Sequence, residues 1–128
     1  MERPQKEFGD YLKEFRRRKS ITLQQLADKL GVSLSLISDI ENRRRNPLDE
    51  EGQMETIAEF LGLTTEEKEI LYDQAARKRN SVPEDIKEVI MYSDEAEYVR
   101  KALRKTKSGQ ISAEQWREFL KGGENENN

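Results

Sequence analysis

The sequence predicts an all-α protein. Charged residues make up 38% of the 128-residue chain and aromatic residues only 7%, a composition that suits short amphipathic helices with solvated outer faces better than a β-sheet. Apolar residues, 34% of the chain, recur at intervals of three and four, which is the period of a helix face. For this length we expect one compact helical domain with a short C-terminal helical extension.

The first helix is predicted over residues 7–19. One face of this segment is apolar and consists of Phe8, Tyr11, Leu12 and Phe15. The basic run Arg16–Lys19 closes the helix. Cations here complement the negative end of the helix dipole, but the same run could also bind phosphate. The sequence leaves both roles open.

Two short helices follow, joined by a turn that contains a glycine. Thr22 and Gln25 form a capping box that starts the first helix, and Gly31 can adopt the left-handed conformation that ends it. Ser33 caps the second helix, which ends at Asn42 because the chain approaches a proline. The inward positions are Leu23, Leu26, Ala27, Leu30, Val32, Ile37 and Ile40, with Leu36 at the margin. This spacing is that of a helix-turn-helix, although it also fits a helical hairpin within a core.

The segment from Gln25 to Pro47 resembles the phage-repressor-like XRE family of bacterial and phage helix-turn-helix regulators. The resemblance lies in Gln25-Leu26-Ala27, Leu30-Gly31-Val32-Ser33, Ser35, Ile37-Ser38, Ile40-Glu41-Asn42 and Arg44-Arg45-Asn46-Pro47. It extends more loosely from Glu7 to Lys78, where residues 57–63 resemble the fourth helix of that family. The resemblance implies a five-helix, repressor-like DNA-binding domain over residues 5–79.

The last two helices of that domain are predicted from Leu48 or Asp49 to Leu61 and from Thr64 to Lys78. Gly52 would lie inside the first of these, where a glycine costs about 1 kcal/mol relative to alanine, so the beginning of this helix is expected to be frayed. A capping box of Thr64 and Glu67 starts the second helix. The inward residues are Met54, Ile57, Ala58, Leu61, Ile70, Leu71 and Ala75.

Three further helices are predicted in the C-terminal extension, residues 80–121. They start at residues 81–84, at residues 93–95 and at the capping box of residues 112–115. Their apolar residues are Ile86, Val89, Ile90, Ala96, Val99, Leu103, Trp116, Phe119 and Leu120. The polar tail, residues 122–128, is expected to be disordered.

The resemblance also implies a DNA-binding surface. In helix-turn-helix docking, the N-terminal part of the second helix meets base edges in the major groove. The base-facing positions carried over from the family are Ser33, Leu34, Ser35, Ser38, Asp39 and Asn42. The corresponding phosphate contacts are Thr22, Gln24, Arg43, Arg44 and Arg45.

Several of these residues have a second role open to them. Asp39 could accept from a cytosine amino group or pair with Arg43. Among the three arginines at residues 43–45, we expect one to bind the DNA backbone and another to pair with Glu41 or with acidic residues of the fourth helix. Related repressors often have glutamine where this chain has Leu23, which puts in doubt the contact that this glutamine makes with DNA.

Composition and charge narrow the classes of function. The chain has no cysteine and no histidine, so disulfides, thiolate metal sites and the commonest proton shuttle are excluded. We therefore expect no enzymatic activity, cofactor or metal. No apolar run approaches the roughly 20 residues needed to cross a bilayer, and a cytoplasmic protein is expected. The net charge of −3 divides into +4 for residues 1–48 (11 basic, 7 acidic) and −7 for residues 49–128 (12 basic, 19 acidic).

The sequence favours a regulator that binds double-stranded DNA, a repressor acting as a homodimer on a palindromic operator. Trp116, Phe119 and Leu120 are the expected dimer or partner interface, unless they pack back onto the preceding helices. One alternative is an antitoxin, whose acidic extension would bind a basic toxin. Another is a protein-interaction module that does not bind DNA, and the salt dependence of DNA binding distinguishes it.

Overall fold

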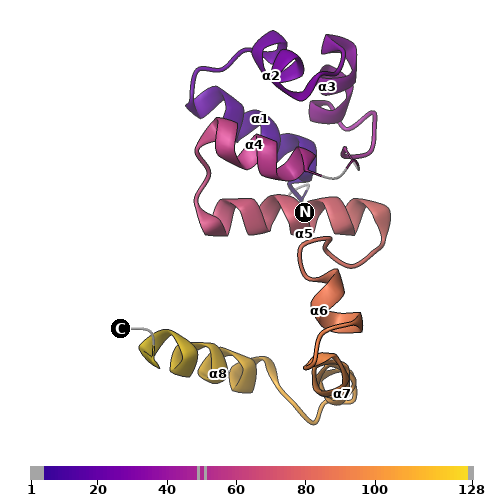
Figure 1. The fold of residues 1–128 in the computed structure, drawn as a ribbon, viewed down its shortest axis with the longest axis vertical. Coiled ribbons are helices and arrows are strands. Elements are labelled where there is room, and N and C mark those ends of the chain that lie inside the picture. Colours follow the sequence, from indigo (N-terminus) through magenta and orange to yellow (C-terminus); the bar gives the residue numbers. More distant parts are fainter. Residues whose placement is uncertain (1–4, 49, 51, 127–128) are drawn as a thin grey trace. The chain divides into compact units, whose positions relative to one another are not determined.

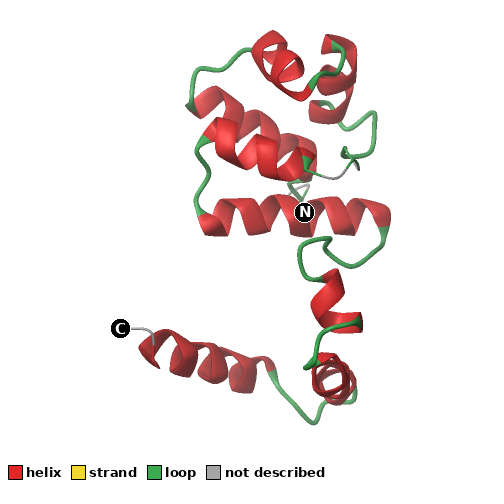
Figure 2. Ribbon diagram, viewed as in Figure 1, coloured by secondary structure: helices red, strands yellow, loops and turns green. Residues whose placement is uncertain are grey.

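Residues 5–48, 50 and 52–126 are described by the structure, which is a computed structural model. The described residues form helices and loops and contain no strand, which confirms the all-α class (Figures 1 and 2). The helices are α1 Phe8–Arg18, α2 Leu23–Leu30, α3 Leu34–Glu41, α4 Gln53–Leu61, α5 Thr65–Arg79, α6 Lys87–Met91, α7 Ala96–Lys107 and α8 Ala113–Glu126. No helix among these residues is long and apolar enough to cross a membrane.

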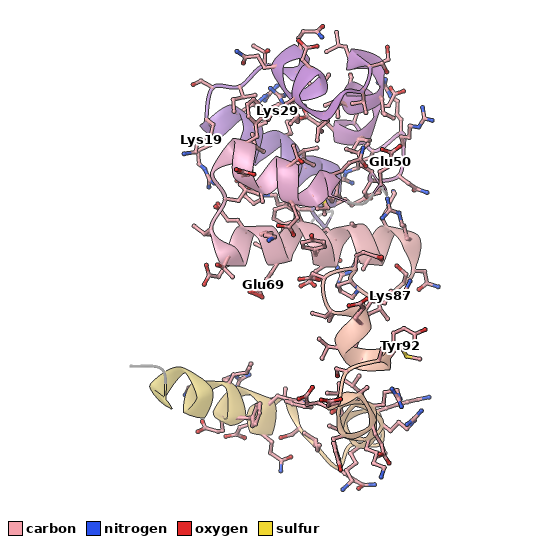
Figure 3. All side chains as sticks on the ribbon, in the orientation of Figure 1. Lys19, Lys29, Glu50, Glu69, Lys87 and Tyr92 are labelled. Carbon is pink, nitrogen blue, oxygen red and sulfur yellow. The ribbon has the colours of Figure 1, made fainter. Side chains whose placement is uncertain are left out.

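The chain divides into two units, residues 1–85 with α1 to α5 and residues 86–128 with α6 to α8. In the first unit, α1 and α4 lie between the α2–α3 pair and α5 (Figure 1). Charged side chains such as those of Lys19 and Glu69 point outward (Figure 3). This arrangement leaves the outer faces of α2 and α3 accessible.

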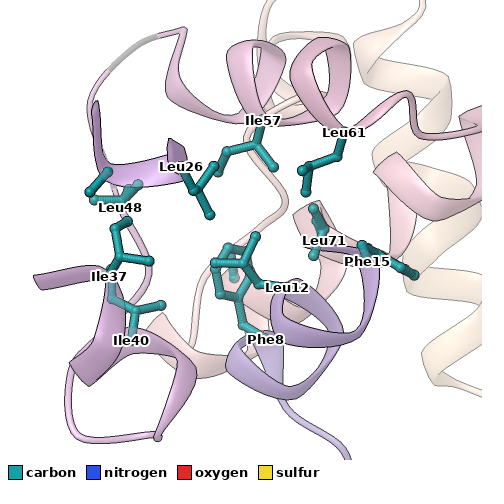
Figure 4. Close-up of a cluster of buried hydrophobic side chains, with 12 residues drawn as sticks. Phe8, Leu12, Phe15, Leu26, Ile37, Ile40, Leu48, Ile57, Leu61 and Leu71 are labelled. Carbon is teal, nitrogen blue, oxygen red and sulfur yellow. The ribbon is translucent and has the colours of Figure 1, made fainter. Parts of the chain in front are cut away.

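The core of the first unit is apolar and draws on all five helices (Figure 4). Its buried members are Phe8, Leu12, Phe15, Leu26, Ala27, Ile37, Ile40, Leu48, Ile57, Leu61, Leu71 and Ala75. Burial of each large side chain contributes about 1.5–3 kcal/mol of transfer free energy. The apolar stripes predicted for the first five helices therefore meet in one core.

Local sequence signals explain where most of these helices begin and end. The predicted capping boxes are present at the starts of α2 and α5, where Thr22 and Thr64 accept hydrogen bonds from the backbone. Gly31 and Gly62 end α2 and α4 with positive φ angles of 68° and 61°, as a left-handed cap requires.

The predicted starts of two helices are wrong. α4 begins at Gln53 rather than at residue 48 or 49. Gly52 has a φ of 86° and therefore precedes the helix instead of lying within it. Asp49 lies outside the described residues. α6 begins at Lys87 rather than at residues 81–84, because residues 84–86 form a turn that comes before the helix.

The C-terminal unit keeps its predicted helix order. Arg100 Nη1 donates to the carbonyl of Ile90 at 2.7 Å and so ties α7 to α6. α8 starts at the predicted capping box but continues through Gly122 to Glu126. The glycines, each costing only about 1 kcal/mol relative to alanine, weaken a helix without ending it. Asn127 and Asn128, the rest of the expected tail, lie outside the described residues.

Candidate DNA-binding surface

The start of α2 and the turn between α2 and α3 are both fixed by local hydrogen bonds. Thr22 Oγ1 accepts from the Gln25 N–H at 3.0 Å, and Gln25 Oε1 accepts from the Thr22 N–H at 2.8 Å. After Gly31, the Val32 N–H donates to the carbonyl of Ala27 at 3.0 Å. Ser33 Oγ then caps α3 by accepting from the Leu36 N–H at 3.1 Å. These bonds confirm the helix-turn-helix geometry that the sequence predicts.

One side of α3 is fixed in the core and the other is accessible. Ile37 and Ile40 are completely or almost completely buried. On the outer side, Ser33 and Ser35 are exposed, and Leu34 is 43% exposed. Ser38 and Asp39 are half-buried. The outer side of α3 therefore presents small hydroxyl groups and one apolar side chain on a rigid support.

The end of α3 joins two of the predicted base-facing residues. Asn42 Nδ2 donates to the Ser38 carbonyl at 2.9 Å and lies 3.4 Å from Ser38 Oγ. With its amide nitrogen used within the protein, Asn42 presents its amide oxygen as an acceptor, and Ser38 keeps a hydroxyl proton to donate. The two side chains therefore act as one polar pair.

The three arginines after α3 have different environments. Arg43 pairs with two carboxylates of the α1 start, Asp10 at 2.5 Å and Glu7 at 3.0 Å. Arg44 is largely exposed and lies 3.5 Å from Asp39. Arg45 is exposed and makes no ion pair with the described part of the chain. The structure thus corrects the expected pairing of Asp39, whose partner is Arg44 and not Arg43.

The expected partner of Glu41 is also wrong. Both oxygens of the Glu41 carboxylate accept from Arg16, at 2.7 Å from Nε and 2.8 Å from Nη2, and both side chains are buried. Arg16 Nη1 also donates to the carbonyl of Ile21 at 2.7 Å. This fork joins α1, the loop before α2 and the last residue of α3, because a planar guanidinium offers enough donors for all three.

Two of the four residues in the basic run at the end of α1 make structural ion pairs. Arg16 is buried against Glu41, and Arg18 pairs with Glu67 at 2.5 Å. Arg17 and Lys19 are exposed. The sequence left a structural role and a phosphate-binding role open for this run. Arg16 and Arg18 have structural roles.

Gly9, which the sequence did not indicate as important, allows α1 to pack against the end of α3. A Cβ atom added to Gly9 would lie 2.2 Å from the carbonyl oxygen of Ile40 and 2.9 Å from that of Glu41. The α1 backbone therefore packs directly on the end of α3. The available signal in the sequence is a glycine inside a predicted helix, where it costs about 1 kcal/mol relative to alanine and so can indicate a packing role.

The pKa of Asp10 is consistent with a stable ion pair between Asp10 on α1 and Arg43 after α3. Burial raises the pKa of Asp10, but hydrogen bonds from Arg43 and from the Glu7 N–H outweigh it and leave the pKa below its ordinary value. The ion-paired, charged form of Asp10 is therefore favoured at neutral pH.

The predicted phosphate contacts on α2 are accessible. Thr22 and Gln24 are both exposed. Gln24 Nε2 donates to Asp28 Oδ1 at 2.8 Å, an exposed contact that can exchange for one with a phosphate oxygen. Both residues belong to the first turn of α2, where unpaired N–H groups favour anions.

Comparison with known proteins gives one family and one solved structure. The structure has the printed title SinR protein/SinI protein complex; its matched chain shares 23% sequence identity, with 91% of this chain and 94% of that chain covered and a TM-score of 0.40. No curated protein matches. The model of the helix-turn-helix domain family matches residues 7–71, slightly more than half of the chain and the whole of the α1–α4 arrangement described above. The chain belongs to the helix-turn-helix domain family.

Proposed function

We propose that the protein is a sequence-specific regulator of transcription, a repressor that binds double-stranded DNA by placing α3 in the major groove. The observation that carries this proposal is the two-sided character of α3, whose inner side is fixed by Ile37 and Ile40 while its outer side is open. A short helix with such a support can enter the major groove without distortion. Membership of the helix-turn-helix family supports the same conclusion.

The proposed base contacts are those of the outer side of α3. Ser33 and Ser35 offer hydroxyl groups to base edges, and Leu34 suits the methyl group of thymine. The Ser38–Asn42 pair offers a donor and an acceptor. Asp39 is a weaker candidate, because it already lies next to Arg44 and faces repulsion from phosphates.

The proposed phosphate contacts are Thr22, Gln24, Arg44 and Arg45. Each cation that neutralises a phosphate releases counterions, so the affinity falls steeply with salt. Because α3 itself carries no cation, most of the affinity is expected to depend on the arginines after α3 and on dimerisation.

The first prediction tests the groove surface. From a pool of random duplexes of about two helical turns, the protein is expected to select a preferred sequence. Ser35→Glu should weaken binding to that duplex by at least about tenfold, because it places a carboxylate among the phosphates. Fluorescence anisotropy with labelled duplex measures the effect.

Thr65→Glu provides the matched control, since it adds the same charge at the exposed start of α5, on the far side of α1 and α4 from α3 (Figure 1). It should change affinity much less. If the two variants bind equally, α3 is not the DNA-binding surface. If the wild-type protein shows no salt-dependent DNA binding, the domain is a protein-interaction module.

The second prediction concerns the proposed homodimer. On α8, Phe119 and Leu120 are 70% and 62% exposed, and Phe119 meets Trp116 edge to face at 6.0 Å between ring centroids. Trp116 packs in part on α7, since its Nε1 donates to Thr106 Oγ1 at 2.8 Å. We infer that this apolar face pairs with a second copy, as a palindromic operator requires.

Light scattering is expected to give a dimer for the wild-type protein and a monomer for the double variant Phe119→Ser/Leu120→Ser, with a corresponding loss of operator affinity. The control is Glu118→Ser/Lys121→Ser on the same helix, which removes an exposed ion pair without changing net charge. A wild-type monomer at all concentrations would assign this face to a different protein, as in the antitoxin alternative. An unchanged dimer in the first variant would place the interface elsewhere.

A further inference from the structure

We propose that Arg43 is a positioning residue, which holds the segment after α3 so that Arg44 and Arg45 face the DNA backbone and which does not itself bind phosphate. This inference rests on the proposed DNA-binding function. It gives the three arginines after α3 two different roles: Arg43 is structural, and Arg44 and Arg45 contact DNA.

The backbone at Arg43 is the first evidence. Its φ of 64° lies in the left-handed region, which a residue with a side chain adopts only where its surroundings hold it there. At this residue the chain leaves α3, with the Arg43 N–H donating to the Ile40 carbonyl at 3.2 Å and the Arg44 N–H to the Asp39 carbonyl at 2.8 Å. The conformation of Arg43 therefore sets the direction in which Arg44 and Arg45 leave the helix.

The side chain of Arg43 shows what holds that conformation. Asp10 Oδ2 accepts from Nε at 3.0 Å and from Nη2 at 2.5 Å. Nη1 lies 3.0 Å from Glu7 Oε2, and Nη2 also donates to the Gln5 carbonyl at 3.3 Å. Every nitrogen of the guanidinium thus has a partner at the start of α1, although these residues are 33 to 38 positions away in the sequence.

The two acceptors are themselves fixed. Asp10 Oδ2 accepts from the Glu7 N–H at 2.8 Å as part of the capping box of α1. Glu7 Oε1 is 2.9 Å from Lys78 Nζ on α5. The network therefore connects the start of α1, the end of α3 and the end of α5, and gives Arg43 a rigid anchor.

The same geometry argues against a phosphate contact by Arg43. To reach a phosphate, Arg43 would have to leave two carboxylates, which would then lack its charge close to a negatively charged ligand. Arg44, whose side chain is 71% exposed and whose one ion pair with the described residues is the 3.5 Å contact with Asp39, can turn to a phosphate at little cost. Arg45 is exposed as well.

The test compares the salt dependence of binding for single variants of the full chain on the selected duplex. Arg44→Ala and Arg45→Ala should each reduce the slope of log affinity against log salt by about 0.9 per protomer, and so by about 1.8 for the proposed dimer, because one phosphate contact is lost in each half-site. Arg43→Ala should keep the slope and lower the affinity by about tenfold, because only the loop geometry is lost. Asp10→Asn, which keeps an acceptor for the Glu7 N–H and removes no cation, should lower the affinity to a similar extent.

A second readout needs no DNA. In the free protein, the backbone amide signals of Arg44 and Arg45 should shift in both Arg43→Ala and Asp10→Asn, while the helical circular dichroism spectrum stays unchanged. Arg43→Lys keeps the positive charge but loses the several N–H donors of the guanidinium. It should therefore bind DNA little better than Arg43→Ala. If Arg43→Ala does not fold, the affinity of Arg43→Lys for the selected duplex is compared with that of the wild-type protein instead.

Three results would overturn the inference: a slope reduced by about 0.9 per protomer, or about 1.8 for the dimer, in Arg43→Ala, tighter binding in Asp10→Asn, or full recovery in Arg43→Lys. Each would mean that Arg43 leaves Asp10 for a phosphate. A wild-type protein that shows no salt-dependent binding would refute the proposed function instead, and the amide shifts would still report whether Arg43 fixes the loop.

Discussion

Replacement of Gly9 by alanine is expected to lower the free energy of unfolding by about 3 kcal/mol or more, at the upper end of the range for overpacked sites. The added Cβ would lie 2.2 Å from the Ile40 carbonyl oxygen and 2.9 Å from that of Glu41. Both atoms belong to the backbone, so no side-chain rotation relieves the contact. Either α1 or the end of α3 has to move, although alanine otherwise favours a helix over glycine by about 1 kcal/mol.

Urea denaturation followed by circular dichroism measures this loss. The matched control is Gly122→Ala in α8, where an added Cβ meets no atom within 4 Å and helix propensity alone should act. Its stability should stay the same or rise. A Gly9→Ala variant as stable as the wild-type protein would show that α1 and α3 are not in close backbone contact.

Helix limits were predictable wherever a local side chain decides them. The capping boxes at Thr22, Thr64 and Ser112 each lie within four residues of sequence, and Gly31 ends its own helix. The sequence alone does not determine the role of Gly52, because a glycine can either weaken a helix or precede it, and only the actual φ distinguishes these cases. The sequence predicts too early a start for α6 because the serine and the acidic residue around Pro83 also occur in ordinary turns.

The contacts that position the candidate site were not predictable. Arg16 and Glu41 are 25 residues apart, and Arg43 and Asp10 are 33 residues apart. Several acidic residues lie closer in sequence to each arginine, so a choice based on sequence distance selects the wrong partner. Pairing depends on which helices pack together, and that in turn depends on the whole core. The base-facing set on α3 remains a prediction that rests on the family pattern.

Breaking the buried Arg16–Glu41 pair is expected to have an effect at least as large as that of Gly9→Ala. Arg16→Met should destabilise the protein by about 3–5 kcal/mol, because it leaves a buried carboxylate without its donors. Glu41→Leu should cost less, since Arg16 keeps the Ile21 carbonyl as an acceptor. Thermal and urea denaturation measure both, and Lys6→Met, which breaks the exposed pair of Lys6 with Glu14, should leave the midpoint unchanged.

The double variant Arg16→Met/Glu41→Leu separates stability from function. Two apolar side chains of similar volume are expected to recover most of the lost stability, because a buried ion pair often contributes no more than a well-packed apolar pair. Operator affinity should recover less, since the fork fixes the last residue of α3 at the point where the Arg43 to Arg45 segment begins. Full recovery of both properties would show that Arg16 and Glu41 only fill space. Recovery of neither would show that the fork is essential to the fold itself, because Arg16 also holds the loop before α2.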